Sequence, residues 1–129
     1  MSKLKIYRKR LRLEDLGQLD DEAIRKHWVS SWNATPEEVS QFNPVAAYES
    51  VGSWGCDSSG WFLLQDRKTG QLFEVHGSHC SCYGFEDQFR PEPTTLEYLK
   101  SANFGLSCGG YDNDPDANRE AVKNFLATL

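Results

Sequence analysis

The fold is decided by residues 61–76, which read WFLLQDRKTGQLFEVH. Two runs rich in apolar and aromatic side chains, 61–66 and 71–76, flank the polar segment 67–70. Such runs favour β-strands, and Gly70 can supply the left-handed backbone conformation that a tight turn between them needs. The first run is apolar on both faces, which is typical of a strand in the middle of a sheet. These residues therefore predict a β-hairpin at the centre of an antiparallel sheet.

One helix is predicted ahead of the hairpin, over residues 20–32. Its stripe of side chains at helical spacing consists of Ile24, His27, Trp28, Ser31 and Trp32. Tryptophans on such a stripe usually face the interior of a small domain. We therefore expect both of them to lie in the core, and His27 to be a hydrogen-bonded histidine on the helix face.

Residues 35–38, Thr-Pro-Glu-Glu, predict the start of a short second helix. Threonine suits the cap position, proline suits the first helical turn, and the second glutamate can close a capping box. The pair Asn-Pro at 43–44 interrupts this helix and can cap a further turn through Tyr48. We therefore expect residues 20–50 to be mainly helical.

The remaining segments complete the expected fold. Basic residues alternate along 3–12 as in an edge strand, and apolar side chains at helical spacing predict helices near 94–102 and 115–127. We expect one α+β domain, residues 1–129, with a small antiparallel sheet built on the central β-hairpin and covered by three or four helices. Its parts are the basic N-terminal strand 3–12, the helical part 20–50, the hairpin and Cys/His loop 53–90, and the C-terminal helices 94–129.

Charge is distributed unevenly along the 129 residues, whose formal net charge is −5. Six of the fourteen basic residues lie within the first twelve, so residues 13–129 carry eight basic against nineteen acidic side chains, a net charge of −11. Such an acidic body repels phosphate, and we expect it to bind no nucleic acid directly. It suits a basic partner surface, such as one that normally faces nucleic acid. The role of the basic N-terminal segment stays open.

The N-terminal residues 1–5 contain no apolar core of a signal peptide, and no apolar run in the sequence has the length of a membrane span. We therefore expect a cytoplasmic protein without membrane contact. In that reducing compartment the cysteines are expected to be free thiols or metal ligands rather than disulfides.

A cluster of histidines and cysteines follows the hairpin. The candidate metal ligands are His76, His79, Cys80 and Cys82, together with Cys56 and Cys108 from elsewhere in the chain. Zinc takes four nitrogen or sulfur ligands, so a set drawn from these residues could close one site. The spacing is C-x-C rather than the usual C-x₂-C, and buried free thiols are common without a metal. We expect no cofactor, with zinc as the open alternative.

A thiol nucleophile is the other chemical interpretation of this cluster. Cys80 or Cys82 would need a base such as His76, because His79 directly precedes Cys80 and adjacent side chains of an extended chain point to opposite faces. No cysteine-hydrolase signature accompanies these residues, and the common nucleotide-binding, zinc-protease and serine-hydrolase motifs are absent. We therefore expect no enzyme and no catalytic residue.

Two segments of the chain, 53–64 and 74–86, read SWGCDSSGWFLL and EVHGSHCSCYGFE. They resemble small proteins encoded by tailed bacteriophages and prophages, whose function is unassigned. The resemblance implies an accessory protein of a phage that works in the cytoplasm of a bacterial host. It brings no catalytic or ligand-binding residues to this chain.

These features favour a non-enzymatic protein that binds and inhibits a host protein, either in anti-defence, such as anti-CRISPR or anti-restriction activity, or in host takeover. An acidic surface would mimic nucleic acid, and aromatic side chains in glycine-rich segments would anchor the partner. The candidate contact residues are Trp54, Tyr83, Phe85, Glu86, Asp87, Tyr111, Asp112, Asp114 and Asp116. The alternatives are a small zinc-binding or structural module and a cysteine-dependent enzyme. The sequence leaves the target and the oligomeric state open.

Overall fold

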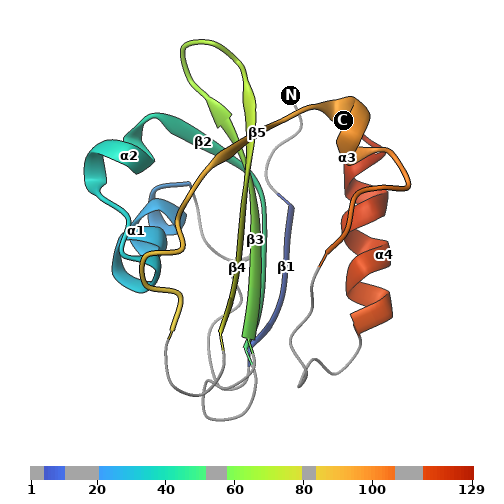
Figure 1. The fold of residues 1–129 in the computed structure, drawn as a ribbon, viewed down its shortest axis with the longest axis horizontal. Helices are drawn as coiled ribbons and strands as arrows, with labels where there is room; N and C mark the ends of the chain where they lie inside the picture. Colours follow the sequence, from blue (N-terminus) through green and yellow to red (C-terminus); the bar gives the residue numbers. More distant parts are fainter. Residues whose placement is uncertain (1–4, 11–20, 52–57, 80–83, 107–114) are drawn as a thin grey trace.

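A five-stranded sheet forms the middle layer of the protein in a computed structural model, which describes residues 5–10, 21–51, 58–79, 84–106 and 115–129 (Figure 1). The strands are β1 (Lys5–Arg10), β2 (Phe42–Val51), β3 (Ser58–Asp66), β4 (Leu72–His79) and β5 (Glu92–Thr94), and they stand in this order across the sheet. β1 runs parallel to β2, and the other neighbouring strands are antiparallel. The predicted basic edge strand is β1.

The predicted hairpin lies at the centre of this sheet. β3 is flanked by β2 and β4, and it pairs with β4 in antiparallel register along its length. Residues 61–64 of β3 are each at most 1% exposed, as expected for a strand that is apolar on both faces. Gly70 has a φ of 78°, the left-handed conformation that the turn needs. The prediction of a central antiparallel hairpin is confirmed.

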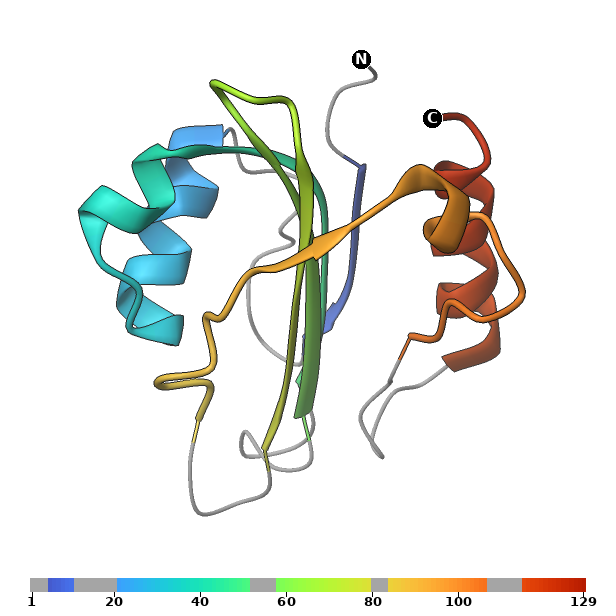
Figure 2. The same ribbon diagram turned by 45° about the horizontal axis from the view of Figure 1, so that its top comes forward.

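Helices cover both faces of the sheet (Figures 1 and 2). α1 (Asp21–Trp32) and α2 (Pro36–Ser40) lie on one side, and α3 (Leu96–Leu99) and α4 (Pro115–Leu126) lie on the other. The described residues therefore form three layers, helices–sheet–helices, and the predicted α+β fold class is confirmed.

Each face of the sheet has its own hydrophobic core. The core under α1 and α2 includes Ile24, Trp28, Trp32, Phe62, Leu64 and Val75. The core under α3 and α4 includes Trp61, Leu63, Leu99, Val122, Phe125 and Leu126. The division follows from strand geometry, because Trp61 and Leu63 point to one face of β3 while Phe62 and Leu64 point to the other. Both tryptophans of α1 are fully buried, so the predicted core stripe is confirmed.

One segment that was expected to be helical is a strand. β2 occupies residues 42–51, so the prediction of a mainly helical stretch over 20–50 is wrong for this part. The strand pairs with β1 on one edge and β3 on the other, and its side chains 44–49 are buried, which no solvent-facing helical turn would achieve. Pro44 is tolerated because it precedes Ala46, the first residue of β2 that pairs with β1, and because the β2–β3 register shifts at this point.

Two further boundaries show how caps set the helices. The capping box of α2 is confirmed, since Thr35 Oγ1 accepts from the N–H of Glu38 and the Thr35 N–H donates to the Glu38 carboxylate. α3 is shorter than the predicted 94–102, because Thr94 completes β5 and Thr95 caps the helix instead. Across the described ranges, none of the helices has the length and apolar character needed to cross a membrane.

Candidate functional site

A hollow with acidic side chains lies on the α3 side of the sheet, where β4, β5 and the start of α3 meet. Its volume is about 360 Å³. Its lining consists of Glu74 and His76 from β4, Glu92, Pro93 and Thr94 from β5, and Thr95 and Tyr98 around the start of α3. Two carboxylates and an aromatic ring thus line one hollow, which we call the acidic hollow.

Local structure explains how these side chains come together. Glu74 and His76 are two residues apart in β4, so both point to the same face of the sheet. β5 pairs with β4 in the register that places Glu92 opposite Glu74. Thr95 then caps α3 by accepting a hydrogen bond from the N–H of Tyr98 at 3.1 Å, and the turn of the helix brings the tyrosine to the hollow.

Glu74 forms the buried part of the acidic hollow, with 6% of its surface exposed. Its Oε1 accepts from Trp61 Nε1 at 2.9 Å, His76 Nε2 lies 3.0 Å from the same oxygen, and the Thr94 side chain also hydrogen-bonds to the carboxylate. Burial by itself raises the pKa of Glu74, but the hydrogen bonds from His76, Thr94 and Trp61 outweigh it, so the pKa is lowered. Glu74 is therefore a fixed negative charge at neutral pH.

The rim of the acidic hollow adds an accessible carboxylate and apolar surface. Glu92 is exposed and lies opposite Glu74, so two like charges stand on neighbouring strands. Tyr98, which lines the hollow from α3, is 42% exposed. Carboxylates beside an aromatic face attract a guanidinium or ammonium group through charge and through the π electrons of the ring. The acidic hollow can therefore receive a cationic side chain.

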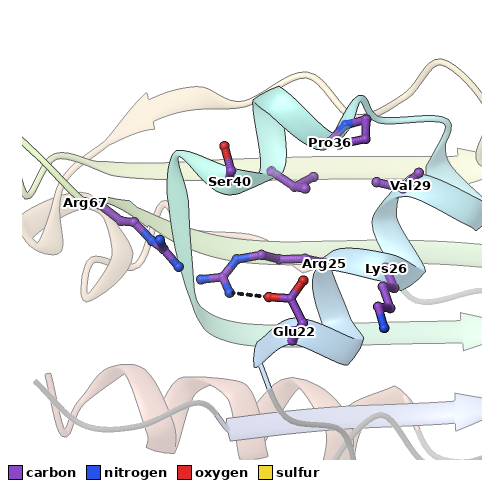
Figure 3. A pocket seen from close by; sticks show the side chains of 8 residues that line it. Glu22, Arg25, Lys26, Val29, Pro36, Ser40 and Arg67 are labelled. Carbon is purple, nitrogen blue, oxygen red and sulfur yellow. Dashed lines mark hydrogen bonds and ion pairs between the residues drawn. The ribbon is translucent and has the colours of Figure 1, made fainter.

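A second pocket lies on the α1 side of the sheet and carries the opposite charge (Figure 3). Its volume is about 320 Å³. Its lining consists of Glu22, Arg25, Lys26 and Val29 from α1, Pro36, Val39 and Ser40 from α2, and Arg67 from the turn between β3 and β4. Three basic side chains against one carboxylate give this cationic pocket a positive charge.

A buried contact between a histidine and a glutamate ties α1 to β2. His27 Nε2 contacts the carboxylate of Glu49, whose side chain is 1% exposed, and Ser31 Oγ lies 3.5 Å from His27 Nδ1. The expectation of a hydrogen-bonded helix-face histidine is confirmed. Because the Glu49 carboxylate is enclosed beneath α1, this pair stabilises the docking of the helix, and loss of either partner would leave an uncompensated buried polar group.

The two histidines of the expected zinc set point to opposite faces of β4. His76 lines the acidic hollow, whereas His79 lies edge-to-face on Phe85 on the α1 side, with ring centroids 4.5 Å apart. One metal ion therefore cannot bind both side chains while β4 keeps its register. Within the residues that the structure describes, no group of three or more His, Cys, Asp or Glu side chains is placed to hold a metal. Outside the described residues lie Cys56, Cys80, Cys82 and Cys108, so a zinc site that uses them stays a prediction.

One expected partner contact is a core residue. Phe85 is 5% exposed and stacks on Trp32, with ring centroids 4.2 Å apart and planes inclined by 5°. The prediction that Phe85 is an exposed anchor is wrong, because stacking on the indole removes the ring from water. Neighbouring glycines shape the backbone of a segment and do not determine where its aromatic side chain lies.

The acidic members of the expected contact set that the structure describes are exposed. Glu86 accepts from the N–H of Gly84 at 2.8 Å, and Asp87 accepts from the side-chain amide of Asn33 at 3.1 Å. The side chain of Asp116 is 98% exposed in the first turn of α4. Each carboxylate thus keeps solvent access for a partner. Outside the described residues lie Trp54, Tyr83, Tyr111, Asp112 and Asp114.

No protein-family model, curated protein or solved structure matches this chain. The resemblance of segments 53–64 and 74–86 to phage proteins therefore stays a prediction. The acidic hollow and the cationic pocket are therefore the features from which a function can be proposed.

Neither pocket follows from a pattern in the sequence. Polar residues at positions 74 and 76, which share one face of β4, are the only local signal of the acidic hollow. The contributions of Glu92 and Tyr98 depend on how β5 pairs with β4, and the cationic pocket depends on a turn that folds back to α1. Both arrangements are long-range, so spacing along the chain does not reveal them.

Proposed function

We propose that this protein is a non-enzymatic, phage-type accessory protein that binds a basic surface of a host bacterial protein and inhibits it. Suitable partners are host defence proteins, such as a CRISPR effector or a restriction enzyme, or host proteins inhibited during takeover, whose basic surfaces normally hold nucleic acid. The acidic hollow is the observation that carries this proposal, because it combines a buried, ionised carboxylate with an exposed carboxylate and the exposed aromatic ring of Tyr98.

An arginine or lysine of the partner would enter the acidic hollow beside Glu92 and Tyr98. Charge complementarity steers association and sets specificity, while the exposed ring of Tyr98 supplies apolar area for affinity. Glu74 and Glu92 repel each other across the strand pair in the free protein. A bound cation would relieve that repulsion, which favours the complex.

The rest of the chain supports the same choice of partner. Residues 13–129 have a net charge of −11, and Glu86, Asp87 and Asp116 are exposed carboxylates away from the hollow. A field of this sign accelerates encounter with a basic protein and repels free nucleic acid. The acidic hollow would then define where the partner is bound.

The test is to capture the host partner from bacterial lysate on the full chain, purify it, and measure its affinity by calorimetry at several salt concentrations. Tyr98→Ala and Glu92→Gln should each weaken binding about tenfold or more, a loss of about 1.4 kcal/mol. Glu120→Gln, which removes an exposed carboxylate from α4, is the matched control and should leave the affinity unchanged. Binding by the wild-type chain should weaken as salt rises.

Two results would contradict the proposal. One is a partner whose affinity is unaffected by Tyr98→Ala and Glu92→Gln. The other is binding of equal strength at low and high salt, which would mean that an apolar surface elsewhere on the protein makes the contact.

A further inference from the structure

The cationic pocket lies on the face of the sheet opposite the acidic hollow. Arg25, Lys26 and Arg67 line it, with Glu22 as the carboxylate among the lining residues. The Glu22 side chain is 68% exposed, so solvent screens much of its charge. In a chain whose net charge is −5, this pocket has a local excess of two positive charges.

The arginine at the inner side of the pocket is fixed by the fold. Arg25 is 8% exposed and donates from Nε and Nη2 to the carbonyl of Phe42 at 3.1 and 3.0 Å. Two nitrogens of the guanidinium thus bind one backbone carbonyl of β2, and Arg25 is in position before any ligand binds.

A second guanidinium is held beside the first through one oxygen atom. Asn43 Oδ1 accepts from Nη2 of Arg25 at 3.1 Å and from Nε of Arg67 at 3.0 Å. Figure 3 shows the ends of the two arginine side chains turned toward each other. Among the described residues the terminal nitrogens of Arg67 have no hydrogen-bond partner. Two like charges this close repel each other, and Glu22, whose Oε2 accepts from Nη1 of Arg25 at 3.3 Å, offsets part of that repulsion. An anion beside the terminal nitrogens of Arg67 removes the rest.

The other side of the pocket is apolar. Val29, Pro36 and Val39 contribute this apolar lining, and Figure 3 shows Val29 and Pro36 across from Arg25 and Glu22. A volume of about 320 Å³ exceeds what one phosphate group occupies and falls in the range of small-ligand sites. The pocket therefore suits a ligand that has an anionic end and an apolar body.

We infer that the cationic pocket binds a phosphate monoester. Such a group carries about −1.5 to −2 charges at pH 7, which balances the excess positive charge, and its oxygens match the N–H groups of arginine. The organic part of the ligand lies against Val29, Pro36 and Val39. A carboxylate or a phosphodiester supplies a single charge, and a nucleic acid chain is repelled by the acidic body.

The experiment is a calorimetric titration of the full chain with phenyl phosphate, and with phenyl sulfate as a monoanion of the same shape, in a low-salt buffer that contains no phosphate. Phenyl phosphate should bind saturably at one site per chain and about tenfold or more tighter than phenyl sulfate. Arg67→Gln and Lys26→Gln should each weaken phenyl phosphate about tenfold. Lys68→Gln removes the same charge one residue from Arg67, from an exposed side chain that does not line the pocket, and should leave the affinity unchanged.

Three results overturn the inference: no saturable binding of phenyl phosphate up to about 10 mM, equal binding of phenyl phosphate and phenyl sulfate, or an equal loss in the Lys68→Gln and Arg67→Gln variants. Circular dichroism of each variant, with melting as for the wild type, shows that a lost affinity is not lost folding. Titration with adenosine monophosphate and with a phosphoserine peptide then identifies the source of the monoester, because the natural class is the one that binds tighter. The acidic hollow takes no part in any of these measurements, so this inference stands or fails separately from the proposed function.

Discussion

The two faces of the sheet bury their tryptophan side chains in different ways. On the α3 and α4 face, the indole N–H of Trp61 donates to Glu74, which in turn contacts His76 and Thr94. On the α1 and α2 face, the indole nitrogens of Trp28 and Trp32 have no hydrogen-bond partner within the described part of the chain. The tryptophan of one face is therefore held by a polar network beneath a pocket, and the two tryptophans of the other are held by close contact between rings and backbone.

The close contact on the α1 face is centred on Trp32. Its indole lies over Gly60 and Gly77, which face each other on β3 and β4, and Phe85 stacks on the ring. Net charge therefore does not determine local charge: a chain of net charge −5 has an acidic hollow on one face and a cationic pocket on the other. We also expect the two faces to respond to different kinds of substitution.

The largest effect is expected from a methyl group added beneath Trp32. A Cβ at position 77 would lie 2.4 Å from the indole, and one at position 60 would lie 2.5 Å from it, while Phe85 limits movement of the ring. Gly77→Ala and Gly60→Ala should each lower the free energy of unfolding by about 3 kcal/mol, measured by urea denaturation.

Gly105→Ala is the control for these substitutions, because a Cβ there meets nothing within 4 Å. It should change the free energy of unfolding by less than about 0.5 kcal/mol. If Gly105→Ala and Gly77→Ala cost the same, close packing against Trp32 does not stabilise the α1 face.

A pair of tryptophan substitutions isolates the polar network on the other face. Trp61→Phe and Trp28→Phe both replace a fully buried indole with a smaller phenyl ring, but only the first removes a hydrogen bond to a carboxylate. Trp61→Phe should therefore lower the free energy of unfolding by about 2 kcal/mol more than Trp28→Phe does. Equal losses in the two variants would mean that the Glu74 hydrogen bond adds nothing to stability.

The smallest effect concerns pH. The lowered pKa of Glu74 means that its ionised form stabilises the fold above the ordinary pKa of a glutamate, and that this contribution is lost as pH falls through the lowered pKa. Glu74→Gln should thus be less stable than the wild type at about pH 7, and the difference should narrow toward about pH 3. Urea denaturation of both proteins across this range measures it. If the difference in free energy of unfolding between the two proteins stays constant with pH, the negative charge of Glu74 does not contribute to stability.

Local sequence signals were sufficient for the hairpin and for α1 and α2. Their spacing and caps act within a few residues, so residues 61–76 and the capping box at Thr35 could be interpreted directly. β2 was mistaken for a helix because its start at Asn43 and Pro44 looks like a cap, whereas pairing with β1 and β3 decides its structure. Long-range pairing overrides local propensity in such cases.

The candidate sites could be predicted much less well. The position of Phe85 on Trp32, the register that sets Glu92 opposite Glu74, and the shared oxygen of Asn43 all join segments far apart in the sequence. The acidic character of the chain could be predicted, because it is a property of composition. The separation of charged side chains into an acidic hollow and a cationic pocket could not be predicted, because it follows from the tertiary fold.

The most direct test of the account is one titration followed residue by residue with ¹⁵N–¹H correlation spectra of the full chain. A short arginine-rich peptide should shift the amides of β4, β5 and α3 around Glu74, Glu92 and Tyr98, and should leave α1 and α2 unchanged. The account predicts that these shifts saturate at low salt and are absent in Glu92→Gln/Tyr98→Ala. Shifts that gather instead on α1 and α2, or that persist unchanged in the double variant, would contradict the claim that the acidic hollow is the site for a basic partner.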